Sequence, residues 1–80
     1  FYITFDVDAV DPAFAPGTGT PVVGGFTSAE ILAVFRSLKG IRLLGADIVE
    51  VLPDRDTSGI TAMLAAQSLA EFLALDALSR

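Results

Sequence analysis

The sequence contains no cysteine and no histidine, and these two absences restrict the chemistry that its 80 residues can support. Without cysteine there is no disulfide framework and no thiolate zinc site. Without histidine the chain supplies no imidazole metal ligand. A metal site built from these residues must therefore draw on oxygen ligands, and the compartment cannot be inferred from redox chemistry.

Basic residues are also scarce. The net charge is −5, and the five basic residues are scattered singly along the chain, at Arg36, Lys39, Arg42, Arg55 and Arg80. Because no basic patch forms, neither nucleic acid nor an anionic membrane is an expected partner. No uninterrupted apolar run reaches the roughly 18 residues of a spanning helix, and nothing resembles a signal peptide.

Polar surface is in short supply for so small a chain. The sequence is 52% hydrophobic and only 19% charged, and it begins at Phe1 within an apolar run. A chain of this size buries only about 60% of the surface that its unfolded form exposes, and without disulfides it needs a polar exterior. We therefore expect residues 1–80 to be a piece of one larger domain.

Hydrophobic periodicity predicts four elements. Residues 1–7 alternate as a strand, and a loop rich in glycine and proline follows over residues 11–25. Thr27 and Glu30 match a capping box that opens a helix ending at Gly40. Residues 43–51 form a nearly continuous apolar strand, typical of one buried on both faces of a parallel sheet. Thr57 or Ser58 is expected to cap a last helix that runs to about residue 76.

The apolar residues of the last helix are expected to form a buried stripe. The order of the four elements indicates the fold class. The stripe comprises Ile60, Met63, Leu64, Leu69, Phe72 and Leu73. The order strand–helix–strand–helix predicts an α/β layered fold, with the two strands parallel and adjacent or nearly so.

Two aspartates close the first strand. In an extended strand, Asp6 and Asp8 would project from the same face about 6.5–7 Å apart. Two carboxylates at the carboxyl end of an apolar strand are costly to bury without a cation between them, and ligands of open α/β sheets collect beyond that edge. Carboxylate oxygens suit Mg²⁺, Ca²⁺ or Mn²⁺. The pair therefore indicates a divalent metal site, and two solvated acids are the alternative.

The loop that follows carries a longer motif. From residue 6 the chain reads Asp-Val-Asp-Ala-Val-Asp-Pro-Ala-Phe-Ala-Pro-Gly-Thr-Gly-Thr-Pro, and then Gly24-Gly25 and Thr27. This segment resembles the signature of the ureohydrolase family, which includes agmatinase, arginase, guanidinobutyrase and formimidoylglutamase. The resemblance continues through residues 45–51 and 56–62, so it covers essentially the whole chain. The Gly-Thr-Gly-Thr-Pro run is more similar to agmatinase than to arginase.

The resemblance implies a fold, a cofactor and a set of site residues. The fold is α/β, a three-layer α-β-α arrangement with a parallel sheet, of which residues 1–80 would be the carboxy-terminal β-α-β-α part. The cofactor is a binuclear Mn²⁺ centre, in which Asp6 would bridge both ions and Asp8 would bind one. Thr20 would line the substrate pocket and Glu50 would hold the guanidinium. A carboxylate accepts a planar guanidinium through two charge-assisted hydrogen bonds; an exposed acid at a strand end is the alternative for Glu50.

The implied reaction is hydrolysis of a guanidino compound to an amine and urea. Agmatine is the first choice of substrate, with putrescine as the amine, and no catalytic acid or base is assigned within the chain. The family uses further histidine and aspartate ligands from upstream segments. The 80 residues alone should therefore bind Mn²⁺ weakly and be inactive. The full-length protein is expected to be a cytoplasmic homo-oligomer, a trimer or a hexamer.

Other interpretations remain open. Phosphatases like haloacid dehalogenase also end a strand in Asp-x-Asp with Mg²⁺ between the acids, although Ala9-Val10 matches their pattern only loosely. A non-catalytic remnant of the ureohydrolase fold is the third possibility. Asp11, before a proline, most simply forms an Asx-turn, whereas Asp47 lies inside an apolar strand and needs a hydrogen-bond partner. Because the strand–helix–strand order predicts a parallel pair, Asp6, Asp8 and Glu50 are also expected to open at the same edge of the sheet.

Overall fold

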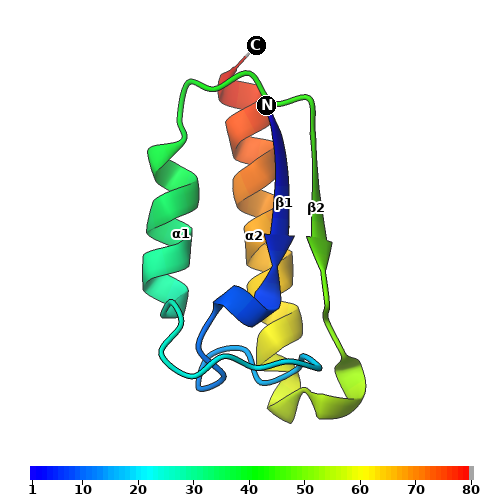
Figure 1. Ribbon diagram of the computed structural model, residues 1–80. Coiled ribbons are helices and arrows are strands. Elements are labelled where there is room, and N and C mark those ends of the chain that lie inside the picture. Colours follow the sequence, from blue (N-terminus) through cyan, green and yellow to red (C-terminus); the bar gives the residue numbers. More distant parts are fainter. Residues whose placement is uncertain (80) are drawn as a thin grey trace.

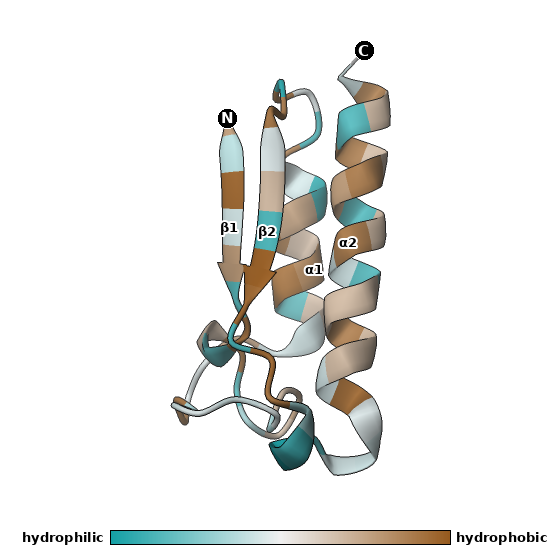
Figure 2. Ribbon diagram, turned by 90° about the vertical axis from the view of Figure 1, so that its right-hand side faces the viewer, coloured by the Kyte–Doolittle hydropathy of each residue, from teal (hydrophilic) through white to brown (hydrophobic). Residues whose placement is uncertain are grey.

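Two parallel strands and two helices make up the chain, of which the computed structural model describes residues 1–79. The elements follow in the order β1 (Tyr2–Asp6), α1 (Ser28–Ser37), β2 (Gly45–Val49) and α2 (Ile60–Leu78). Both helices lie on one side of the sheet (Figure 2). The predicted α/β class and β-α-β-α order are confirmed, and the chain itself holds one helical layer of the three-layer fold.

The register of the sheet aligns the two strands from end to end. β1 pairs with β2 in parallel, from Tyr2 beside Gly45 to Asp6 beside Val49, so the predicted adjacency is confirmed. The other face of the sheet carries no helix in the described chain. There the Asp47 carboxylate accepts hydrogen bonds from the Tyr2 hydroxyl at 3.0 Å and the Thr4 hydroxyl at 2.5 Å. Asp47 thus has the partners that its position demanded, but β2 is only partly buried, contrary to the expectation of burial on both faces.

An aromatic row joins the two layers. The Phe35 ring packs edge to face against Phe5 at 5.1 Å between ring centroids and against Phe72 at 4.8 Å. All three rings are buried, together with Val7 and Val10 just beyond the end of β1. Offset edge-to-face pairs are favoured by the quadrupoles of the rings. This row fixes α1 and α2 against the buried face of β1.

The capping box of α1 is confirmed. The Thr27 hydroxyl accepts from the Glu30 amide at 3.1 Å, and the Glu30 carboxylate accepts from the Thr27 amide at 2.9 Å. The helix ends at Ser37, slightly before the expected stop. Gly40 has a φ of 101°, a left-handed conformation that glycine adopts without steric cost, and it turns the chain toward β2.

The expected cap of α2 is wrong. Thr57 and Ser58 lie in a separate 3₁₀ turn, η3 (Thr57–Gly59), and neither caps the helix. Instead the Asp56 carboxylate accepts from the amides of Thr61 at 2.8 Å and Ala62 at 2.9 Å. Burial acts to raise the pKa of Asp56, but these hydrogen bonds outweigh it and the pKa is lowered. A carboxylate at a helix start also complements the helix dipole.

The buried stripe of α2 differs from the expected one. Met63, Leu69 and Leu73 are exposed, and the buried positions are Thr61, Leu64, Ser68, Phe72 and Leu75. Two polar residues can occupy the stripe because both are hydrogen-bonded, Ser68 to the Leu64 carbonyl at 2.8 Å and Thr61 to the loop described below. Apolar pattern alone could not anticipate these partners.

The segment Thr57–Leu78 is long and apolar enough, by length and composition only, to cross a membrane. Polar residues such as Gln67, Ser68 and Glu71 interrupt the segment, so it contains no uninterrupted apolar run of that length. Core helices of globular proteins can be equally long and apolar, and here Glu71 forms an ion pair with Arg36 of α1 at 2.6 Å. The absence of a membrane partner stays a prediction.

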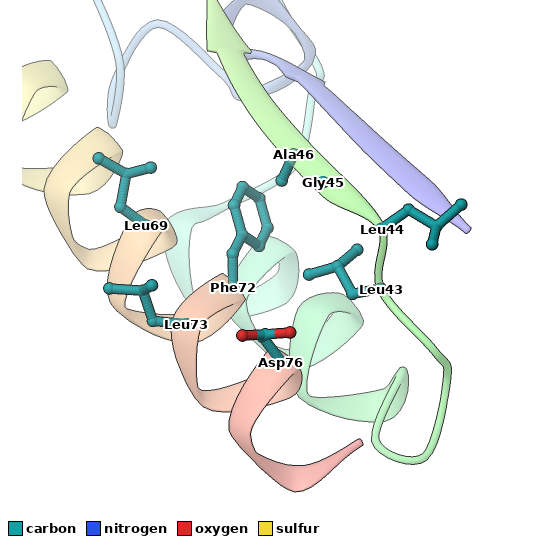
Figure 3. A pocket seen from close by; sticks show the side chains of 8 residues that line it. All are labelled: Leu43, Leu44, Gly45, Ala46, Leu69, Phe72, Leu73 and Asp76. Carbon is teal, nitrogen blue, oxygen red and sulfur yellow. The ribbon is translucent and has the colours of Figure 1, made fainter. Parts of the chain in front are cut away.

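An apolar hollow lies between the start of β2 and the carboxy-terminal half of α2 (Figure 3). Its volume is about 360 Å³. It is lined by Leu43, Leu44, Gly45, Ala46, Leu69, Phe72, Leu73 and Asp76. Because β2 begins here and ends at the aspartate edge, the hollow is remote from the predicted site residues.

Candidate functional site

The predicted site residues gather at the carboxyl edge of the sheet. Asp6 is the last residue of β1 and lies beside Val49, the last residue of β2. Glu50 follows Val49 directly, and Asp8 lies in the 3₁₀ turn η1 (Val7–Ala9) that follows β1. Both strands point toward this end of the molecule, where the connecting loops collect (Figure 1). The predicted common edge for Asp6, Asp8 and Glu50 is therefore confirmed.

The predicted strand geometry of the two aspartates is wrong. β1 ends at Asp6, so Asp8 does not project from the same pleated face as Asp6. The Asp6 carboxylate accepts a hydrogen bond from the Asp8 amide at 3.0 Å and caps the turn η1. Aspartate side chains compete in this way with the backbone ladder of a strand. The turn brings Asp8 out of the sheet and toward the loop over residues 11–25.

Thr20 meets Asp8 at the tip of this loop. The Thr20 hydroxyl donates to a carboxylate oxygen of Asp8 at 2.7 Å. The sequence predicted Thr20 as a wall of the substrate pocket, and the structure adds a direct contact with a predicted metal ligand. Two hydrogen bonds thus connect the three residues, because Asp8 donates to Asp6 through its amide and accepts from Thr20 through its carboxylate.

The two ends of the loop are closed on each other. The Asp11 amide donates to the Phe26 carbonyl at 2.8 Å, and the Phe26 amide donates to the Ala9 carbonyl at 3.0 Å. The Asp11 carboxylate accepts from the amides of Ala13 and Gly24, both at 2.9 Å. These two hydrogen bonds lower the pKa of Asp11. The expected Asx-turn is confirmed, and Asp11 also ties the beginning of the loop to its end.

The middle of the loop is anchored to the chain that leads into α2. The Gly17 amide donates to the buried Thr61 hydroxyl at 2.8 Å, and the Gly17 carbonyl accepts from the Leu52 amide at 2.7 Å. A Cβ at position 17 would lie 2.7 Å from the Cβ of Asp56, so only glycine fits. The Arg55 guanidinium donates to the Gly19 carbonyl at 3.3 Å. Sequence reasoning missed these anchors.

A signal for part of this anchoring was present in the sequence. Gly17 sits in a run of alternating glycine and threonine, where a close backbone approach is a common reason for glycine. Its partner Thr61 is 44 residues away, and nothing in the spacing connects the two. Thr18, 1% exposed, is buried beside the anchor, and its hydroxyl finds no hydrogen-bond partner within residues 1–79.

Glu50 stands at the sheet edge in an unusual backbone conformation. Its φ is 71°, which lies in the left-handed region. For a residue with a Cβ this conformation is energetically unfavourable, and it is kept only where the surrounding structure imposes it. The side chain is exposed. A carboxylate presented in this way beyond the end of a strand is free to accept a cation from the solvent side. Its role toward a guanidinium stays a prediction.

The donor set fits a hard divalent cation. Each aspartate carboxylate has one oxygen engaged, Asp6 with the Asp8 amide and Asp8 with Thr20. In the described part of the chain the second oxygen of each accepts no hydrogen bond. Ligating carboxylates are commonly oriented by such bonds to the oxygen that faces away from the metal. Among residues 1–79 no group of three or more potential ligands is assembled, so these residues offer a partial set.

Comparisons of the sequence and of the structure with known proteins point to the same family. The arginase family profile matches residues 1–75. The chain is 53% identical over 76 residues to an agmatinase of Escherichia coli, covering 95% of this chain and 25% of that protein. It is 53% identical over 74 residues to a guanidinopropionase of Pseudomonas aeruginosa, covering 92% of this chain and 23% of that protein.

A solved structure shares the fold of this chain. Proclavaminate amidino hydrolase from Streptomyces clavuligerus superimposes with a TM-score of 0.96 and 47% identity, over 99% of this chain and 26% of that one. The chain thus spans about a quarter of the length of these relatives. Within that quarter the backbone superimposes closely on that of the amidino hydrolase.

Proposed function

This chain belongs to the arginase family, and we propose that it supplies part of the metal and substrate site of a ureohydrolase, which hydrolyses a guanidino compound to an amine and urea. The observation that carries the proposal is the meeting of Asp6, Asp8 and Glu50 at one sheet edge. Because the chain spans about a quarter of its relatives, the activity proposed is that of the full-length protein.

Asp6 and Asp8 hold the metal in this proposal. Manganese fits because both ligands are carboxylates with one oxygen already oriented and the other available. When bound, the ions supply Lewis-acid activation of water near neutral pH. The residues of this chain hold the metal site in shape, because η1 and the anchored loop fix where the two carboxylates point.

Glu50 holds the guanidinium. A guanidinium presents only N–H donors, and a carboxylate that is not used as a metal ligand can accept two of them in one plane. Glu50 follows the end of β2, at the same edge as the metal ligands. Fixing the guanidinium there turns its central carbon toward the water to be added, which is a contribution of positioning rather than of proton transfer.

Agmatine is the first choice of substrate, with putrescine and urea as products. Relatives named agmatinase and guanidinopropionase match this chain at the same 53% identity. The segment therefore recognises the part that guanidino substrates share, and the tail of the substrate is left to other parts of the protein. Assembly as a homotrimer or homohexamer and a cytoplasmic location remain proposals of the same kind.

Urea release by the full-length protein tests the proposal. Protein loaded with Mn²⁺ is incubated with agmatine, with 3-guanidinopropionate and with p-nitrophenyl phosphate. We expect urea from at least one guanidino compound, dependent on Mn²⁺, and no phosphate from the ester. Phosphate release without urea would favour the phosphatase alternative, and neither product would favour a non-catalytic member of the family.

A further inference from the structure

We propose that Thr20 is a positioning residue for the metal ligand Asp8, and that it acts on manganese binding before any substrate arrives. The inference rests on the proposed function, since it assumes that Asp8 binds the metal. It begins from the 2.7 Å hydrogen bond in which the Thr20 hydroxyl donates to one carboxylate oxygen of Asp8.

The hydroxyl of Thr20 has only one hydrogen to donate. Once that hydrogen is given to Asp8, the oxygen of Thr20 retains two lone pairs and can act toward any further group only as an acceptor. A guanidinium, which only donates, can still approach those lone pairs. Thr20 can therefore line the substrate pocket and orient Asp8 at the same time. The hydrogen bond to Asp8 sets the direction of the Thr20 hydroxyl.

Asp8 needs this support because its own element is short. It lies in the three-residue turn η1, outside the ladder that holds Asp6. Its backbone amide is fixed by Asp6 at 3.0 Å, but the direction of its carboxylate is set by Thr20. One oxygen is held by the hydroxyl, and the other, which accepts no hydrogen bond within residues 1–79, is available to a metal ion. Removing partners of this type commonly costs about 10- to 100-fold in metal affinity.

Thr20 is itself held in place by the anchored loop. Gly19 is bound through its carbonyl by Arg55, and Thr18 is buried. Gly17 is fixed on both its amide and its carbonyl, by Thr61 and Leu52. The hydroxyl that reaches Asp8 thus belongs to a segment attached to the start of α2. This attachment explains how an exposed loop residue can hold a metal ligand in one direction.

Manganese binding without substrate distinguishes this role from a purely substrate-binding one. Full-length wild type, Thr20→Val and Thr20→Ser are titrated with Mn²⁺, and free Mn²⁺ is measured by electron paramagnetic resonance. We expect Thr20→Val, which keeps the shape and removes the hydroxyl, to weaken binding of at least one ion about 10- to 100-fold. Thr20→Ser keeps the hydroxyl and should stay within a few-fold of wild type.

Thr57→Val is the matched control. It makes the same chemical change at an exposed threonine of η3, and it should leave Mn²⁺ affinity unchanged. If Thr20→Val binds Mn²⁺ like wild type and only its KM for agmatine rises, Thr20 acts on substrate alone and the inference is overturned, while the proposed function stands. If wild type itself neither binds Mn²⁺ nor releases urea, the proposed function fails and the inference fails with it.

Discussion

At the scale of single residues, the three acids of the sheet edge are held in different ways. Asp6 caps a turn, Asp8 accepts from a loop threonine, and Glu50 extends into solvent from a left-handed backbone. The first two carboxylates are constrained, which agrees with their proposed role as metal ligands. The third is accessible, which agrees with its proposed role of holding a guanidinium that is exchanged at each turnover.

Replacement of Glu50 by glutamine should impair turnover with little effect on the metal. The change keeps the shape and removes the charge that a guanidinium pairs with. Loss of such a charge-assisted pair should lower kcat/KM for agmatine by about 30- to 1000-fold, while Mn²⁺ content stays near that of wild type. Asp54→Asn removes an equal charge from the exposed turn after β2 and serves as the control. Activity of Glu50→Gln within a few-fold of wild type would refute the guanidinium role.

Replacement of Asp6 or Asp8 by asparagine should remove metal and activity together. A neutral amide neither bridges two cations nor offsets their charge, so metal analysis and urea release should fall in parallel in the full-length protein. Excess Mn²⁺ should restore part of the activity if binding is the only defect. A variant that keeps its full manganese content yet hydrolyses nothing would instead assign that aspartate to proton transfer.

At the scale of elements, the site depends on a junction between the loop over residues 11–25 and the start of α2. Thr61 serves the loop and the helix at once, because its hydroxyl accepts from the Gly17 amide while its own amide donates to Asp56. The carboxyl edge of the sheet is therefore shaped by an element that begins 54 residues after Asp6.

Loss of the Thr61 hydroxyl should loosen the junction. Thr61→Val leaves the buried amide of Gly17 without an acceptor, and an unsatisfied buried donor costs about 1–3 kcal/mol. Thr61→Ser keeps the acceptor and should be milder. Chemical denaturation of the full-length protein measures both. Equal stability of the valine variant and wild type would show that water or another group accepts the hydrogen bond of the Gly17 amide.

Acid should weaken the cap of α2. The pKa of Asp56 is lowered in the folded chain, so its contribution is complete above the unfolded value of about 3.9 and is lost as the pH falls through the lower folded value. The difference in thermal stability between wild type and Asp56→Asn should therefore be largest above about pH 4 and shrink at lower pH. A difference that does not vary with pH would mean that the charge of Asp56 contributes nothing.

At the scale of the whole molecule, residues 1–79 leave one face of the sheet and much of α2 uncovered. Leu44 is 79% exposed and Leu73 is 71% exposed, and both line the apolar hollow of Figure 3. Contiguous apolar surface of this kind drives association in water. The Phe5–Phe35–Phe72 row gives the chain a core of its own, but a small one.

The 80 residues produced alone should therefore bind a hydrophobic dye and self-associate. Dye fluorescence and light scattering over a range of protein concentrations measure both effects. Leu44→Lys together with Leu73→Lys places charge on the hollow and should reduce both signals. A wild-type chain that stays monomeric and binds no dye would show that this exposed surface is too dispersed to act as a patch.

The order of the elements and the family could be read from the amino-acid sequence. Alternation, capping residues and apolar runs are local, so the strands, the Thr27 cap and the Asx-turn at Asp11 could be predicted from neighbours along the chain. The motif from Asp6 to Pro21 identified the family because a match over so long a run of residues is specific. Parallel pairing then placed Asp6 and Glu50 at one edge, since parallel strands end on the same side.

The hydrogen bonds that hold the site in place could not be read from the sequence, because they join distant parts of the chain. The contact of Thr20 with Asp8 and the anchoring of Gly17 by Thr61 depend on hydrogen bonds between groups 12 and 44 residues apart. Several oxygens along the chain could accept each of these donors, and local pattern cannot choose among them. The choice is made when α2 packs against the sheet and brings the start of that helix beneath the loop.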